Sequence, residues 1–257
     1  MTGHVRYSVS GNVAHVLFDR PDVRNAMTFD MYRQLEDACA AIRNDPSVRV
    51  AVFRGAGGEA FVAGTDIQQF LAFETPQDGV AYEERIDAVI HAVETLPIPT
   101  IAVVEGFAMG GGFALAIACD LRLATPDAKF GYPIARTVGN CLSMANIARL
   151  TWNFGPSLAK RVMLLADIID AETALDVNFL LELVDRENLE ARVAGLCERI
   201  AGHAPITMRV TKEAIRRVAL ADVPQGQDLI ETTYGSADFR IGVESFLAKK
   251  RPAWTGR

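Results

Sequence analysis

Two glycine-containing segments carry residue types suited to binding an oxyanion. They are residues 60–67 (A-F-V-A-G-T-D-I) and residues 105–113 (E-G-F-A-M-G-G-G-F), and each places flexible backbone directly before an expected helix. The first amides of a helix lack intrahelical acceptors and carry partial positive charge. Two such ends meeting at one point would bind the oxygen of a thioester carbonyl as it gains negative charge. Tight packing of helices on a sheet would explain the same glycines, and the spacing alone does not decide between the two interpretations.

A third glycine-containing segment does not predict a cofactor. Residues 55–60 follow an expected strand and formally match the dinucleotide fingerprint G-x-G-x-x-A. That motif works only where a helix begins inside it, and no helix signal appears here before Asp66. We therefore interpret the segment as a turn and expect no nicotinamide cofactor. His91 and Glu94 are three residues apart without a third ligand nearby in the sequence, so we expect no metal site.

The elements that must position these segments follow from hydrophobic periodicity. Alternation over residues 13–18 predicts a strand, and Thr28 is the expected N-cap of a helix that ends near Asn44. Further strands are predicted at residues 48–54, 100–104 and 121–124, and further helices from about 66, at 82–95 and at 113–119, with a loop over 106–112. Strands that alternate with helices predict a largely parallel α/β architecture.

The C-terminal part of the chain has a different pattern. From about residue 155 onward no strong strand pattern appears, and helices are predicted within 157–200, at 204–220 and at 238–250. We therefore divide the chain into an α/β core, residues 1–200, and a C-terminal helical region, residues 201–257.

Composition excludes several other classes of protein. Half of the 257 residues are hydrophobic, 23% are charged, and the net charge is −6, which disfavours binding to nucleic acid or to anionic lipid. The longest uncharged run, residues 106–119, is too short and too rich in glycine to span a membrane, which takes about 20 apolar residues. No signal peptide is visible, and the four cysteines lack C-x-x-C spacing. Reduced thiols and a cytoplasmic location are therefore expected.

The two glycine-containing segments, in this order, resemble the signatures A-F-x-A-G-x-D-[IL] and N/E-G-x-A-x-G-G-G of the crotonase (enoyl-CoA hydratase/isomerase) superfamily. Further matches follow along the chain: D-R-P at 19–21 with R-N-A-M at 24–27, C-D at 119–120, F-G-Y-P at 130–133 and F-L-A-K-K-R at 246–251. The resemblance covers nearly the whole chain. It implies a crotonase-like ββα spiral core with a C-terminal helical region for oligomerisation, and homotrimers that can pair into hexamers.

The resemblance also implies a ligand and the residues that bind it. The ligand would be an acyl-CoA thioester, with coenzyme A as part of the substrate and no separate cofactor. The two oxyanion donors would be the backbone N–H groups of Thr65 and Gly111. Five other residues are implied to contact the substrate: Ala63 and Asp66 beside the thioester and the adenosine, Arg24 at the CoA phosphates, and Phe246 with Lys249 at the nucleotide end, from a neighbouring subunit.

The sequence departs from the family pattern where acid–base chemistry is expected. The hydratases of this family use two glutamates, and the matching positions here are Ala114 and Ile134. Neither side chain can accept a proton. The loop at 138–144 also lacks the carboxylate that isomerase-like members place there. The two-glutamate hydration mechanism therefore cannot be transferred, and non-standard chemistry is expected.

The region expected to line the pocket offers five residues that could replace the glutamates: Tyr132, Arg136, Asn140, Cys141 and Ser143. Arg136 and Asn140 are also expected to bind the substrate. The pair Asn140-Cys141 resembles the loop of the aryl-CoA dehalogenases, in which Gly-Asn precedes a nucleophilic aspartate. Cys141 would act as a nucleophile only if a helix terminus or Arg136 lowered its pKa; otherwise it and Tyr132 are packing residues. We expect an acyl-CoA enzyme that stabilises a thioester enolate or oxyanion. A hydrolase, a decarboxylase, a dehalogenase-like enzyme and a catalytically silent acyl-CoA-binding protein remain alternatives.

Overall fold

The fold is built on a six-stranded sheet, seen in a computed structural model that describes residues 3–221 and 223–257. The strand order is β1-β2-β3-β5-β7-β10, and all neighbours are parallel except the β1–β2 hairpin. The strands are β1 (His4–Ser10), β2 (Val13–Asp19), β3 (Val50–Gly55), β5 (Thr100–Val104), β7 (Leu121–Ala124) and β10 (Glu182–Leu183). β3 and β5, in the middle of this sheet, are almost wholly buried, as their β-branched composition predicts.

A second, smaller sheet has the order β4-β6-β8-β9. Its strands are β4 (Ala60–Val62), β6 (Phe107–Met109), β8 (Lys129–Gly131) and β9 (Ile169–Asp170). Three times in succession the chain runs through one strand of the large sheet and then one strand of the small sheet, and helical structure follows: β3–β4, β5–β6 and β7–β8. This repeat is the ββα spiral that the family resemblance implied.

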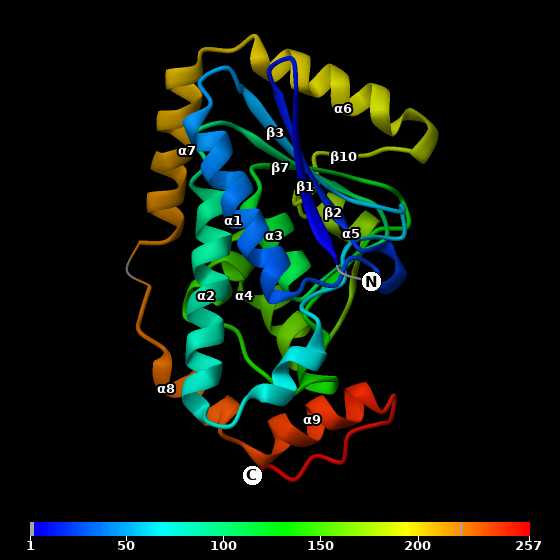
Figure 1. Ribbon diagram of the computed structural model, residues 1–257, viewed down its shortest axis with the longest axis vertical. Helices are drawn as coiled ribbons and strands as arrows, with labels where there is room; N and C mark the ends of the chain where they lie inside the picture. Colours follow the sequence, from blue (N-terminus) through cyan, green and yellow to red (C-terminus); the bar gives the residue numbers. More distant parts are fainter. Residues whose placement is uncertain (1–2, 222) are drawn as a thin grey trace.

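Helices surround the two sheets (Figure 1). In the first 201 residues they are α1 (Phe29–Asn44), α2 (Pro76–Glu94), α3 (Gly111–Ala118), α4 (Met144–Leu164), α5 (Ala171–Asp176), α6 (Arg186–Ala201) and the 3-10 helices η1 (Pro21–Val23), η2 (Ile67–Ala72) and η3 (Pro133–Arg136). Three more follow: α7 (Pro205–Ala219), α8 (Gln227–Tyr234) and α9 (Ala237–Leu247). Among the described residues, no helix has both the length and the apolarity needed to cross a membrane.

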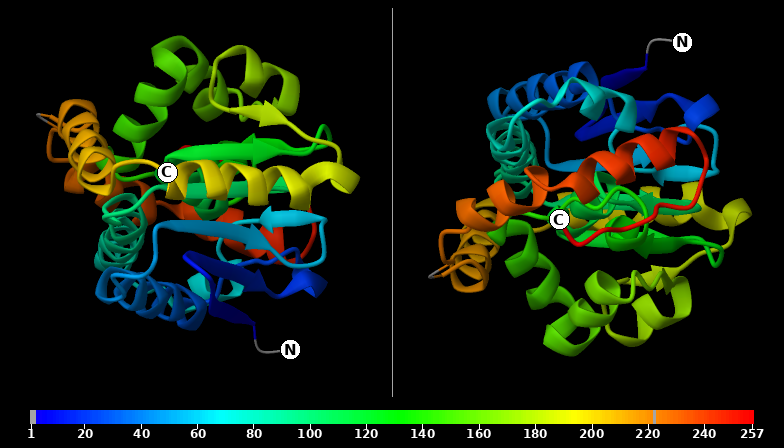
Figure 2. Two further views of the ribbon diagram at one scale, coloured as in Figure 1. Left: turned by 90° about the horizontal axis from the view of Figure 1, so that it is seen from above. Right: turned by 90° about the horizontal axis from the view of Figure 1, so that it is seen from below.

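The C-terminal helices lie on the outside of the core. In Figure 1, α6 crosses the top of the molecule, α7 and α8 follow one side, and α9 crosses the bottom; the two views of Figure 2 place α6 and α9 at opposite ends. The last helix and the residues that follow it therefore cover the end of the molecule opposite to α6.

Most of the longer elements agree with the sequence-based predictions. β5 and β7 have the predicted bounds, and Thr28 caps α1 by accepting a hydrogen bond from the Met31 N–H. The predictions missed β1, β4, β8 and α8, and they placed a loop where β6 lies. They also found no strand after residue 155, where β9 and β10 occur. Strands of two or three residues are too short for an alternating pattern to be visible.

The helix α3 packs against β4 at backbone distance. Seven of its eight residues are buried, and a Cβ atom added to Gly112 would overlap the carbonyl oxygen of Val62. This close approach brings the N-terminus of α3 to the chain segment that follows β4. The interpretation of the glycines as allowing tight packing is therefore confirmed at Gly112, and this packing also sets where the helix begins.

The glycine segment between β3 and β4 is a turn. Gly57 and Gly58 have positive φ angles, and residues 60–62 then form β4. A strand follows the glycines where the dinucleotide motif requires a helix, so the interpretation as a turn is confirmed.

Gly106, at the corner between β5 and β6, tests the steric basis of this architecture. Its φ is 63°, and an added Cβ would overlap the carbonyl oxygen of Glu59. We expect Gly106→Ala to lower the free energy of unfolding by about 3 kcal/mol or more, measured by urea denaturation. Gly11 is the matched control, because its φ is 60° and no atom lies within 4 Å of the added Cβ. Gly11→Ala should cost only about 1 kcal/mol, and equal losses would contradict the assigned clash.

Candidate active site

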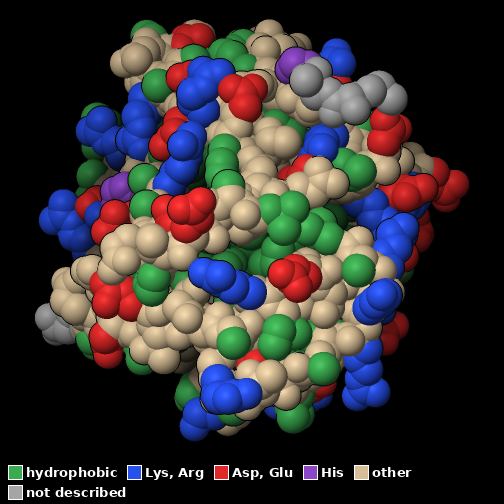
Figure 3. Space-filling model, turned by 60° about the horizontal axis from the view of Figure 1, so that its bottom comes forward, with side chains coloured by type: hydrophobic (Ala, Val, Ile, Leu, Met, Phe, Trp, Pro, Cys, Tyr) green, Lys and Arg blue, Asp and Glu red, His purple; other side chains and the backbone are tan. Residues whose placement is uncertain are grey.

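A cavity of about 110 Å³ lies where the two glycine-containing segments meet. Residues 63–67, residues 109–114, α2, residues 132–142 and Phe246 of α9 contribute to its lining. On the face of the molecule that carries α9, hydrophobic side chains gather in a hollow near the middle, and charged side chains lie around it (Figure 3). The cavity is mostly apolar, so the few polar groups in it determine its chemistry.

Two backbone amides at this cavity have no hydrogen-bond acceptor among the described residues: the N–H groups of Thr65 and Gly111. Their neighbours do have acceptors, since the Asp66 N–H donates to the Met27 carbonyl and the Gly110 N–H donates to the Gly131 carbonyl, at 2.8 and 3.0 Å. Gly111 is the first residue of α3, where the helix leaves its amides unpaired. Two potential donors therefore line one cavity from separate parts of the chain.

The two segments that carry these amides are in contact. A Cβ atom at Gly110 would lie 3.6 Å from the Cα of Gly64, and one at Gly111 would lie 3.6 Å from the Oγ1 of Thr65. The backbone bridge between Met27 and Thr65 holds the first segment. The pairing of β6 with β4 and β8 holds the strand that precedes the second. Both donors are therefore fixed by sheet structure.

Two tyrosine hydroxyl groups fix the side chain of Thr65. Its Oγ1 lies 2.8 Å from the Tyr32 hydroxyl and 2.7 Å from the Tyr82 hydroxyl. Burial raises the pKa of both tyrosines, so both stay protonated. The Tyr32 hydroxyl also occupies the position of a Cβ on Gly111. Glycine is therefore required at position 111, because any side chain there would clash with the Tyr32 hydroxyl.

Glu83 on α2 places a carboxyl group in the cavity wall, and no sequence motif had indicated it. Its exposed fraction is 2%. The Tyr234 hydroxyl donates to Oε1 at 2.6 Å, and the Ser143 N–H donates to Oε2 at 3.1 Å. Burial is the main cause that raises the pKa of Glu83 to about 8; the Tyr234 hydrogen bond lowers it and the nearby Asp87 charge raises it. Glu83 shares a buried helix face with Ile86 and Ile90. An acid within an apolar helix face is the sequence feature that could have indicated a functional residue here.

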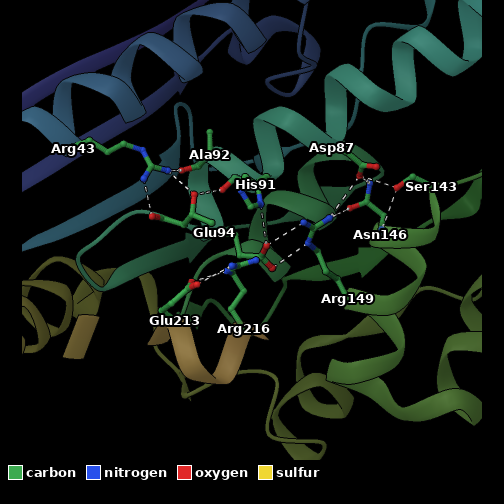
Figure 4. Close-up of polar contacts among 11 residues, drawn as sticks. Arg43, Asp87, His91, Ala92, Glu94, Ser143, Asn146, Arg149, Glu213 and Arg216 are labelled. Carbon is green, nitrogen blue, oxygen red and sulfur yellow. Dashed lines mark hydrogen bonds and ion pairs between the residues drawn. The ribbon is translucent and has the colours of Figure 1, made fainter. Parts of the chain in front are cut away.

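The other carboxyl groups along α2 are in a different environment. Asp87 accepts hydrogen bonds from the Ser143 hydroxyl and the Asn146 amide, at 2.7 and 3.0 Å. Arg149 of α4 lies 3.6 Å from Asp87 and forms two hydrogen bonds to Glu94, at 3.1 and 3.0 Å (Figure 4). This buried cation lies beside the carboxyl groups of both Asp87 and Glu94. Glu83 receives only neutral donors.

Two further polar groups at the cavity lack partners. Within residues 3–221 and 223–257, the Tyr132 hydroxyl and the Asn140 Oδ1 are buried without a hydrogen bond. Asn140 uses its Nδ2 on the Tyr234 hydroxyl, at 3.4 Å. Buried polar groups are normally paired, so both are available to a ligand. The structure brings these two predicted residues to the same cavity as Thr65 and Gly111.

Cys141 and Arg136 are not brought to the cavity. The Cys141 thiol lies 3.9 Å from the Leu229 carbonyl of α8, and burial raises its pKa to about 11. Arg136 is exposed and does not line the cavity. The condition for a nucleophilic thiol, a lowered pKa, is therefore not met, and the packing alternative agrees with the observed contacts.

Ala114 and Ile134, the two positions at which the family resemblance implied glutamates, are buried and line the cavity. Their side chains present only apolar atoms there, so neither can move a proton.

The residues assigned to the rest of the ligand lie in several places. Ala63 lines the cavity, whereas Asp66 pairs with Arg20 at 2.8 Å and caps η2. The exposed Arg24 lies with its guanidinium 5.0 Å from the centre of the Phe107 ring.

The last helix lies beside the cavity of its own chain. Phe246 lines this cavity with an exposed fraction of 46%, because α9 packs against η2 through contacts such as that between Phe239 and Phe70. Lys249 is exposed two residues after the end of α9 and does not line the cavity. Contact of these two residues with the nucleotide end in a neighbouring subunit stays a prediction.

A second, larger cavity of about 700 Å³ lies on another side of the molecule, between the end of α3, α4, α6 and α7. Neither Thr65 nor Gly111 lines it. Its size alone does not make it the reactive site, because it lacks the two unpaired amides.

Comparison with known proteins agrees with the site and the fold. Residues 8–257 match the family model described as enoyl-CoA hydratase/isomerase. The chain is 30% identical to a crotonyl-CoA hydratase of Syntrophomonas wolfei over 246 residues, which cover 93% of each protein. Among solved structures, it is similar to methylmalonyl-CoA decarboxylase in complex with 2-nitronate-propionyl-CoA (TM-score 0.91, 26% identity, 99% of each chain) and to an enoyl-CoA hydratase/carnithine racemase of Magnetospirillum magneticum (TM-score 0.81, 30% identity, 100% and 97% of the two chains).

The chain belongs to the enoyl-CoA hydratase/isomerase family, and its fold is that of the crotonases. Its named relatives act on acyl-CoA thioesters and are hydratases, with decarboxylases among the similar structures.

A pH titration of stability tests the buried state of Glu83. Between about pH 4.5 and 8 the folded protein keeps a proton on this carboxyl that the unfolded chain has released. The unfolded state binds fewer protons over this range, so the free energy of unfolding should fall as the pH rises, by up to about 1.4 kcal/mol per pH unit. Glu83→Gln is neutral at every pH and should remove this slope, as measured by urea denaturation at several pH values. An unchanged slope would contradict the assigned environment.

Proposed function

We propose that this protein is an enzyme that acts on acyl-CoA thioesters and stabilises a thioester enolate or oxyanion. The donors are the backbone N–H groups of Thr65 and Gly111. The observation that carries the proposal is that both amides are unpaired within the described chain and line one mostly apolar cavity. In such surroundings, preorganised donors stabilise developing negative charge far more than water does.

The size of the cavity supports a short acyl group. Its volume of about 110 Å³ equals the space of about four water molecules in the liquid. An acyl portion of roughly that many non-hydrogen atoms would fill it. Phe246 of α9 lines the cavity and is 46% exposed. The exposed cation of Arg24 supports binding of the CoA phosphates near the first glycine-containing segment.

The acid–base chemistry in this proposal is non-standard for the family. Because Ala114 and Ile134 leave two cavity positions apolar, hydration by a pair of glutamates is unavailable. Decarboxylation is the second candidate reaction, since it reaches an enolate without a base and the chain resembles methylmalonyl-CoA decarboxylase at a TM-score of 0.91. Turnover assays with enoyl-CoA and malonyl-CoA substrates distinguish hydration from decarboxylation. Tight binding without turnover of either would identify a catalytically silent homologue.

Substitution of Gly111 tests the contribution of one amide. Gly111→Pro removes the N–H at the first position of α3, where proline is tolerated, and Gly111→Ala is the matched control that keeps it. Both are made together with Tyr32→Phe, because the Tyr32 hydroxyl would overlap the new Cβ. We expect kcat of the proline variant to be about 100- to 1000-fold below that of the alanine variant.

Calorimetry with CoA and acyl-CoA accompanies this comparison. Acyl-CoA binding by both variants shows that the cavity is intact. Equal kcat values in the two variants would contradict the role of the Gly111 amide. Failure of the unmodified protein to bind any acyl-CoA would remove the proposed ligand.

We also propose a homotrimer, which can pair into a hexamer, assembled through the C-terminal helical region of residues 201–257. The helix α7 has no buried residue. It exposes four aliphatic side chains: Ile206, Val210, Ile215 and Val218. Exposed aliphatic side chains gathered on one element favour an interface.

Light scattering tests the assembly. The unmodified protein should have about three or six times the chain mass of 27.9 kDa. Ile206→Asp combined with Val210→Asp should reduce this mass to that of one chain, because it places charges in the contact. A monomeric unmodified protein would contradict the proposal.

A cytoplasmic location is the remaining part of the proposal. The four cysteines are free thiols, three of them buried. Unpaired thiols are typical of proteins in a reducing compartment.

A further inference from the structure

The helix α2 brings one carboxyl group to the cavity of the proposed oxyanion donors. We propose that Glu83 is the catalytic residue that transfers the proton at the α-carbon of the acyl thioester. The inference rests on the proposed function, because it needs the acyl group to lie in this cavity. It adds the acid–base group that the apolar side chains of Ala114 and Ile134 do not supply.

Placement carries this assignment. Among the residues that line the cavity in the described chain, Glu83 is the only carboxylic acid. It lines the same 110 Å³ space as Thr65 and Gly111. A short acyl group held by its carbonyl oxygen at the two amides therefore has its α-carbon in a space that also borders this carboxyl.

The hydrogen bonds of Glu83 orient it and leave it able to react. Each carboxyl oxygen accepts one hydrogen bond, from the Tyr234 hydroxyl and from the Ser143 N–H. A carboxylate has about four lone-pair sites, so each oxygen retains one for a substrate proton. Arg149 is engaged with Glu94 and Asp87. No fixed cation therefore holds Glu83 permanently ionised.

The environment also matches the proton affinity that the step needs. The titratable and charged groups around Glu83 are the hydroxyls of Tyr32, Tyr82, Tyr132 and Tyr234, the thiol of Cys141, Asp87, and Arg149 beyond it. Burial raises the pKa of Glu83 to about 8. A group that titrates near the working pH can both take and return a proton.

The step balances as a reversible proton transfer. The ionised Glu83 takes a proton from the α-carbon, so that the C–H bond breaks and an O–H bond forms on the carboxyl. The electron pair of the C–H bond forms the double bond between the α-carbon and the carbonyl carbon. The carbonyl π pair moves to the thioester oxygen, where the N–H groups of Thr65 and Gly111 stabilise the enolate. The return of a proton from Glu83 to the α-carbon restores the thioester, and no oxidant or second substrate is needed.

Hydrogen exchange measures this step without a full reaction. The protein is incubated with butyryl-CoA in D2O, and deuterium at the α-carbon is followed by NMR and mass spectrometry. Glu83→Gln should reduce the exchange rate by about 100-fold or more, while calorimetry shows that butyryl-CoA still binds. Exchange that persists in this variant overturns the role of Glu83 and leaves the proposed function intact. Binding without exchange in the unmodified protein also overturns the inference, and absence of binding overturns both.

Two substitutions around Glu83 give a readout that a purely structural role would not move. Tyr234→Phe removes a donor to the ionised carboxyl, so the midpoint of the pH–rate profile should rise from near pH 8 by about one unit. Asp87→Asn removes a like charge that does not line the cavity, so the midpoint should fall while exchange at high pH is retained. A midpoint that moves in neither variant overturns the assignment, even if Glu83→Gln fails to fold.

Discussion

The candidate site is built on the contact between two backbone segments, residues 63–66 and 109–112. Each segment contributes an amide that is unpaired within the described chain, and unpaired buried donors are costly unless a ligand or water satisfies them. The small sheet supports both segments, because β4 precedes the first and β6 precedes the second. Gly112 then allows α3 to approach β4 at backbone distance. The arrangement is therefore fixed by main-chain geometry and does not depend on the rotamer of any side chain.

Around this contact the helix α2 separates its acids by environment. Asp87 and Glu94 share the buried cation of Arg149, whereas Glu83 has only a hydroxyl and an amide as donors. The same kind of side chain therefore lies beside a fixed cation next to α4 and has only neutral donors at the cavity, where burial raises the pKa of Glu83. Different environments for chemically similar carboxyl groups are a general way in which one site obtains groups of different proton affinity.

The C-terminal helices have two distinct relations to this site. α8 and α9 complete it, since Tyr234 contacts Glu83 and Phe246 lines the cavity. α7 makes no such contribution and leaves aliphatic side chains exposed. The helices α7, α8 and α9 thus combine closure of the cavity, by α8 and α9, with an exposed apolar surface on α7.

Local sequence was enough to predict elements such as β5 and β7 and to find the two glycine-containing segments, because periodicity and glycine placement are local properties. It was also enough to show that Ala114 and Ile134 cannot transfer protons. The folded chain was needed to see that Thr65 and Gly111 line one cavity, that the Cys141 thiol packs against α8, and that Glu83 lines the cavity. These outcomes depend on contacts between residues far apart in the chain, such as Glu83 with Tyr234. Whether a carboxyl group is solvated, paired or buried is set by such contacts and leaves little trace in local sequence.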